Sequence, residues 1–89
     1  MARLVFPLNL ARKAACPAAD IVAGTAAELF EAYFQSHPEI RSYVLDDQGG
    51  VRKHVVVLVD GLNLRDRRRL SDLIRPDSEV FVFPALSGG

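Results

Sequence analysis

The residues best suited to take part in a reaction are the last two of the sequence, Gly88 and Gly89. Because glycine has no Cβ, such an ending could thread a narrow tunnel and bring its terminal carboxylate close to the reacting groups of another protein. Pro84 stiffens the chain where it leaves the last predicted strand, so we expect residues 85–89 to project from the fold. The simpler alternative is a frayed chain end without function. The context favours a protein whose own carboxylate reacts, with another enzyme supplying the chemistry.

Other side chains with chemical potential have simpler explanations. Cys16 has no identifiable activating neighbour and is interpreted as a free structural cysteine rather than a nucleophile. His37 is expected to cap a helix, His54 to lie at the surface where a strand begins, and Asp46 and Asp47 to form a solvated turn. The sequence contains no Gly-x-Ser-x-Gly, phosphate-binding loop or His-Glu-x-x-His motif. Because another enzyme would process the C-terminal carboxylate, we predict that the chain is not itself an enzyme. One Cys and two His are too few for a zinc cage, so we also predict no bound metal.

One local basic run, Arg67, Arg68 and Arg69, interrupts an otherwise mixed surface pattern. The simplest interpretation is a solvated, flexible loop. The functional alternative is a docking patch for an acidic partner, in which the arginines mainly raise the association rate. Nucleic-acid binding is a weaker third alternative, because aspartates flank the run and no aromatic platform lies near it.

The composition sets the frame for these candidates. The chain has 89 residues, of which 49% are hydrophobic, and its 11 Lys and Arg balance 11 Asp and Glu. These values are typical of one small globular domain and argue against disorder or dedicated nucleic-acid binding. No apolar run approaches the ~20 residues that span a bilayer, and the first residues do not resemble a signal peptide. We expect a cytoplasmic monomer that binds neither nucleic acid nor membranes.

The periodicity of apolar residues predicts one helix among several strands. Thr25 and Glu28 have the spacing of a capping box, and an apolar stripe follows them, which predicts a helix over residues 25–37. Leu70, Leu73 and Ile74 are expected to attach the irregular segment 65–76 to the core. A turn is expected at 46–50, a loop or hairpin turn at 8–17 and a tight hairpin at Asp60-Gly61. Strands are predicted over residues 3–6, 20–23, 42–45, 54–59, 62–64 and 79–83.

This order of elements predicts an α+β fold of the β-grasp (ubiquitin-like) kind. A mixed sheet of about five strands would be covered by one main helix, because a single amphipathic helix needs a sheet face to cover. The valine-rich run at 54–59 is expected to be the central strand, buried on both faces, with Val55, Val57 and Val59 at the centre of the sheet. The predicted organisation is a β-grasp domain over residues 1–84 and a flexible C-terminal tail over residues 85–89.

Three segments of the sequence resemble the MoaD/ThiS family of ubiquitin-like sulfur carriers. They are the ending from Asp77 to Gly89, the strand and turn from Val55 to Asn63, and the start of the helix from Thr25 to Leu29. The resemblance implies that an ATP-dependent, ubiquitin-activating-type adenylyltransferase activates the terminal carboxylate. Sulfur then replaces AMP, and the resulting thiocarboxylate passes to a sulfur-acceptor biosynthetic enzyme.

The same resemblance implies a role for each residue near the end of the chain. Gly89 would carry the sulfur and Gly88 would give clearance. Partner enzymes would be contacted by Phe83, Pro84, Ala85, Leu86 and Ser87. No cofactor is implied for the chain itself, since ATP is used by the activating partner. A metalloprotease is a further partner that the resemblance suggests.

The branch of the family is less sharply indicated. The length of segment 43–53 resembles the longer members, and the ending leans towards the CysO-like carriers that supply sulfur for cysteine, methionine or another thio-metabolite or cofactor. One alternative is the small subunit of molybdopterin synthase. A further alternative, from another class, is a ubiquitin-like protein modifier or a binding module.

Overall fold

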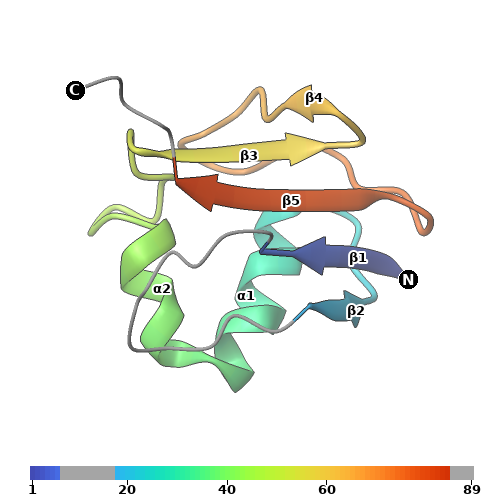
Figure 1. Ribbon diagram of the computed structural model, residues 1–89, viewed down its shortest axis with the longest axis horizontal. Coiled ribbons are helices and arrows are strands. Elements are labelled where there is room, and N and C mark those ends of the chain that lie inside the picture. The colour runs from blue at the N-terminus through green and yellow to red at the C-terminus, as the bar shows by residue number, and fades with distance from the viewer. Residues whose placement is uncertain (7–17, 85–89) are drawn as a thin grey trace.

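The strands form one mixed sheet in the computed structural model, which describes residues 1–6 and 18–84. Within these ranges the strand order is β2-β1-β5-β3-β4 (Figure 1). β5 is central, parallel to β1 and antiparallel to β3, while β2 and β4 are the edges. The strand bounds are β1 (Ala2–Val5), β2 (Ala19–Ile21), β3 (Val55–Val59), β4 (Leu62–Asn63) and β5 (Glu79–Pro84). The prediction of a five-stranded, mixed β-grasp sheet is confirmed.

The prediction that the valine-rich strand is central is wrong. β3 lies next to the edge, and its burial alternates along the strand instead of being continuous. Val55 and Val57 are buried, whereas Val56, which lies between them, and Leu58, which follows Val57, are only half-buried. Consecutive side chains of a strand point to opposite faces, so this alternation means that only one face of the sheet is covered. β-Branched residues favour strands on either face, which is why composition alone suggested complete burial.

The main helix, α1 (Ala26–Ser36), begins as predicted from Thr25 and Glu28. The Thr25 hydroxyl accepts from the Glu28 backbone N–H at 3.2 Å, and the Glu28 carboxylate accepts from the Thr25 N–H at 3.1 Å. The helix ends at His37, whose backbone N–H donates to the carbonyl of Tyr33. Both predicted roles, the capping box and the C-terminal cap, are confirmed.

A second helix, α2 (Pro38–Val44), occupies the segment for which a short strand at 42–45 was predicted. Pro38 ends α1 but also fits the first turn of the next helix. Backbone N–H groups in a first turn have no acceptor within the helix, so proline, which lacks this N–H, loses no hydrogen bond there. Ile40 and Val44 are one helical turn apart, and both are completely buried. Leu45 then pairs with Val51 in an isolated bridge that closes the predicted turn at 46–50.

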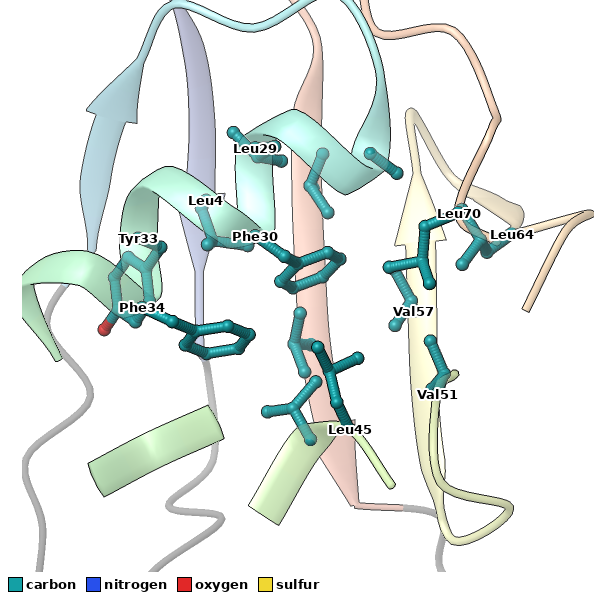
Figure 2. Packing of buried hydrophobic residues seen from close by; sticks show 14 of the residues in the cluster. Leu4, Leu29, Phe30, Tyr33, Phe34, Leu45, Val51, Val57, Leu64 and Leu70 are labelled. Atoms are coloured by element: carbon teal, nitrogen blue, oxygen red, sulfur yellow. The ribbon is translucent and has the colours of Figure 1, made fainter. Parts of the chain in front are cut away.

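The hydrophobic core lies between the two helices and the covered face of the sheet. In Figure 2 the rings of Phe30 and Phe34 point from α1 towards the sheet, with Leu70 on the far side of the core. Leu70 and Ile74 attach the irregular segment to this core as predicted, but Leu73 is 80% exposed. The expectation for Leu73 is therefore wrong. The loop predicted at 8–17 lies outside the described residues.

The hairpin between β3 and β4 is confirmed at Asp60-Gly61. Both residues have positive φ angles, 52° and 84°, as a two-residue turn matched to the twist of a hairpin requires. Asp60 tolerates this conformation better than most residues, and Gly61 adopts it without steric cost. The hairpin leaves β4 at the sheet edge with an exposed Leu62.

Candidate functional site

The central strand β5 ends directly before residues 85–89, which the sequence analysis predicts to be a reactive tail. Pro84 is the last residue of β5 and pairs with Val55 of β3, while the other side of β5 pairs with β1. β1 pairs with β5 over residues 79–81 and β3 pairs with it through Pro84, so the sheet fixes the place where β5 ends (Figure 1). The tail residues Ala85, Leu86, Ser87, Gly88 and Gly89 lie outside the described residues.

An apolar surface lies on the uncovered face of the sheet beside this exit. Val80 and Val82 of β5 are buried beneath the helices, so Phe81 and Phe83 point to the opposite face, where both are half-buried. Residues paired across strands share a face: Phe83 lies opposite Val56, and Phe81 lies between Leu58 and Val5. We call this surface the outer apolar patch; its members are Val5, Val56, Leu58, Phe81 and Phe83.

Only Phe83 of the outer apolar patch was predicted as a partner-binding residue. The alternation of Glu79–Pro84 already places Phe81 on the same face as Phe83, so this residue could have been found from the sequence. Val5, Val56 and Leu58 could not, because their position depends on the register of strands far apart in the chain.

The same face becomes polar towards the start of β5. Arg3 of β1 pairs with Asp20 on one side and with Glu79 on the other. The Arg3 guanidinium lies 3.6 Å from the Asp20 carboxylate, and both side chains are 52% exposed. Such a pair contributes little to stability. The outer face of the sheet therefore has a charged end at this ion pair. Its other end, where β5 finishes, is the outer apolar patch.

The start of β5 is fixed by the Asp60 carboxylate. One oxygen of Asp60 accepts from the Glu79 backbone N–H at 2.9 Å and the other from the Ser78 hydroxyl at 2.8 Å. The Ser78 oxygen in turn accepts from the Arg75 N–H, which satisfies this buried hydroxyl. These hydrogen bonds, first that from Glu79, lower the pKa of Asp60. The β3–β4 turn thus holds the first residues of the strand that leads to the tail.

Exposed basic side chains lie near the other end of β5. Arg52, Lys53 and His54 directly precede Val55, the partner of Pro84, and all three are exposed. The Arg52 Nε donates to the carbonyl of Ser42 at 2.7 Å, which attaches this turn to α2. His54 is therefore a surface residue where β3 begins, as predicted.

The three arginines of the run differ in their surroundings: Arg67 is half-buried, whereas Arg68 and Arg69 are exposed. One terminal nitrogen of Arg67 donates to the carbonyls of Arg52 and Val55, at 2.7 and 2.6 Å. Arg67 therefore bridges its loop to the start of β3, and the docking hypothesis retains only Arg68 and Arg69, which are exposed.

The loop that carries these arginines, residues 65–71, is braced by aspartates and is not the irregular solvated segment that we expected. We call it the arginine loop. The Asp66 carboxylate accepts from the Ser71 hydroxyl and from the backbone N–H groups of Arg69 and Arg68. These bonds, led by that from Ser71, lower the pKa of Asp66. The Asp72 carboxylate accepts from the N–H groups at 65 and 66.

The remaining candidates have the structural roles that the sequence suggested. The His37 ring stacks on Tyr33, with centroids 4.6 Å apart. The Asp46 carboxylate accepts from the N–H groups of Gln48 and Gly50 and so shapes the turn at 46–50. Cys16 lies outside the described residues. Among the residues that are described, no group of three metal-ligating side chains occurs, and no helix is long and apolar enough to cross a membrane.

Comparison with known proteins places this geometry in context. The model of the ThiS family matches residues 18–89. No curated protein matches the chain. The crystal structure of SAMP1 from Haloferax volcanii is 25% identical, with a TM-score of 0.76 over 99% of this chain and 98% of that one.

Two further solved structures show the same fold at lower identity. The solution structure of small archaeal modifier protein 1 from Methanosarcina acetivorans is 17% identical, with a TM-score of 0.78 over 99% of this chain and 95% of that one. A chain of the Amycolatopsis orientalis BexX/CysO complex is 13% identical, with a TM-score of 0.74 over the whole of both chains. At these identities the likeness concerns the fold alone.

Proposed function

Because the chain belongs to the ThiS family, we propose that it is a sulfur carrier whose reactive group is the Gly89 carboxylate. The observation that carries the proposal is the family match through residue 89, together with a central strand that ends five residues before that glycine. A chain with this role is a protein substrate rather than an enzyme. It needs no cofactor of its own, and we expect it to act in the cytoplasm.

The proposed chemistry has two steps. A carboxylate oxygen of Gly89 attacks the α-phosphate of ATP, and pyrophosphate leaves, which gives an acyl-adenylate. Sulfide then attacks the carbonyl carbon and loses its proton, and AMP leaves with the oxygen that joined it to the carbonyl. The product is a thiocarboxylate that an acceptor enzyme consumes. Gly88, with no side chain, gives the adenylating enzyme room to reach this carbon.

The outer apolar patch supports the proposal that partner enzymes dock beside the tail. A half-exposed apolar surface next to a reactive terminus can hold that terminus in register with an enzyme's active site, and burying it on association is favourable. Phe83 and Pro84 stand at the border between this surface and residues 85–87. The proposed partners are a ubiquitin-activating-type adenylyltransferase, a sulfur-acceptor enzyme and a metalloprotease that trims or releases the tail.

The test is incubation with ATP, sulfide and the adenylyltransferase encoded beside the protein, followed by intact-protein mass spectrometry. We expect one oxygen to be replaced by sulfur, with the change confined to the C-terminal peptide. Deletion of Gly89 should abolish the change, and Gly88→Val should slow it, while both variants keep the wild-type melting temperature. A folded, intact chain that is never adenylated would overturn the proposal.

A matched pair of variants tests the docking surface. Phe81→Ser removes the centre of the outer apolar patch, whereas Arg3→Ser changes the charged end of the same face. We expect Phe81→Ser to raise several-fold the carrier concentration needed for half-maximal adenylation, and Arg3→Ser to leave it close to wild type. Equal effects of the two variants would contradict a role for the apolar patch.

The second candidate function is that of a protein modifier. It is favoured by the 25% identity to SAMP1, a small archaeal modifier protein from Haloferax volcanii, over almost the whole of both chains. In that case the activated Gly89 carbonyl would be attacked by a lysine amine of another protein, with loss of AMP, and an isopeptide bond would form. The same incubation, with added cell extract and without sulfide, distinguishes the two by giving protein adducts instead of the thiocarboxylate.

A further inference from the structure

A groove of about 440 Å³ lies on the helix-covered side of the molecule, away from the outer apolar patch. Its walls come from four separate elements: α1, α2, the turn at 46–50 and the arginine loop. Phe34 and Leu45 contribute apolar surface, whereas Arg41 and Arg69 contribute the guanidinium groups. The groove exists because residues 38–44 form a helix instead of the predicted strand.

The two guanidinium groups at this groove are available to a ligand. Arg41 and Arg69 are exposed, and neither side chain donates a hydrogen bond or forms an ion pair with any described residue. This contrasts with Arg67, two residues away from Arg69, whose guanidinium is bound to two carbonyls. Within residues 1–6 and 18–84, no carboxylate lies within 4 Å of either guanidinium group.

The position of Arg69 is fixed before any ligand binds. Its backbone N–H donates to Asp66 at 2.9 Å, and Leu70, which follows it, is buried in the core. The turn at 46–50 packs against the same loop: a Cβ on Gly50 would lie 3.1 Å from the carbonyl oxygen of Arg67. A side chain presented by a braced loop loses less entropy on binding than one on a flexible segment.

We propose that this groove docks a short segment of a partner protein in which carboxylates flank an apolar side chain. The apolar side chain would contact Phe34 and Leu45, and the carboxylates would pair with Arg41 and Arg69, since guanidinium groups bind carboxylates through two parallel hydrogen bonds. Glu31 also lines the groove and disfavours a uniformly charged polyanion such as nucleic acid.

This docking site is independent of the tail chemistry. The groove lies on the face that the helices form, whereas the outer apolar patch lies on the opposite face of the sheet. A partner held in the groove would leave the outer apolar patch free for an enzyme. The site therefore suits a protein that brings the carrier to its acceptor, and its existence does not rest on the reaction at Gly89.

The experiment is an NMR titration of the ¹⁵N-labelled full chain with the blocked peptide Glu-Asp-Glu-Phe-Glu-Asp-Glu. We expect saturable shifts of the amides of Phe34, Arg41, Leu45 and Arg69, larger at low salt. Replacing the peptide's Phe with Ala should weaken binding. The double variant Arg41→Glu/Arg69→Glu should weaken it about tenfold, as expected for loss of two exposed ion pairs, while the matched control Lys53→Glu should stay within about twofold of wild type.

Three results would overturn the proposal. The first is the absence of saturable shifts at the groove with millimolar peptide. The second is a set of shifts on β3 and β5 that follows the outer apolar patch instead. The third is that a single-stranded oligonucleotide of equal charge produces the same shifts with equal affinity. Removal of Gly88 and Gly89 should leave peptide binding unchanged, so this test stays separate from that of the thiocarboxylate.

Discussion

Replacing Arg67 with methionine should destabilise the fold, although its neighbours in the run are surface residues. The substitution keeps most of the aliphatic stem but removes the bonds to the carbonyls of Arg52 and Val55, at 2.7 and 2.6 Å. Hydrogen bonds that involve a charged group contribute about 1.5–3 kcal/mol each. Arg67 is half-buried, and water can replace part of what is lost, so we expect a total loss of about 1–3 kcal/mol.

Urea denaturation followed by circular dichroism measures this loss. For a domain of this size each kcal/mol corresponds to a fall of about 4–8 °C in the melting temperature, which gives a second readout. Arg68→Met is the matched control: Arg68 is exposed and its side chain makes no hydrogen bond within the described residues, so its effect should stay within about ±0.5 kcal/mol. Equal unfolding midpoints for the two variants would refute the assignment of Arg67 as a bridge.

Two further predictions concern the packing of the core and the stability of the fold at low pH. Phe30 is 1% exposed and stacks near Phe34, so Phe30→Ala should cost about 3–5 kcal/mol in urea unfolding; a loss near zero would contradict the observed face of α1. The pKa values of Asp60 and Asp66 are lowered from 3.8 in the folded state, so the stability they contribute is complete above that value and is lost as pH falls through the folded pKa. The urea midpoint should therefore fall more steeply below pH ~4 in the wild type than in Asp60→Asn; parallel curves would show that Asp60 does not hold the start of β5.

Local signals in the sequence were sufficient for α1 and β5. The capping box at Thr25 and Glu28 defines the start of α1, and the alternation of buried with exposed or half-buried side chains defines β5. Both signals come from residues that are only a few positions apart in the sequence. The helix α2 was missed since Pro38 was interpreted only as a stop. The spacing of Ile40 and Val44, both buried, was the available signal.

The candidate site was predictable only where it is local in sequence. The ending at Gly88 and Gly89 can be recognised without a structure, and so can Phe83. The sequence does not show that Arg67 is hydrogen-bonded while Arg69 is exposed, because the partners of Arg67 lie 12 and 15 residues away. Likewise, the position of β3 beside the edge depends on which strands pair, and β-branched composition carries no information about that.

The central place of β5 has a consequence for synthesis on the ribosome. β1, near the start of the chain, pairs in parallel with β5, which begins only at Glu79. Until that strand emerges, β2-β1 and β3-β4 are separate hairpin-like pairs with no shared edge, and their apolar faces have no common core. We therefore expect a nascent or truncated chain that stops before β5 to stay unfolded and open to proteolysis. Degradation of unfolded chains would then favour those whose synthesis has already passed β5.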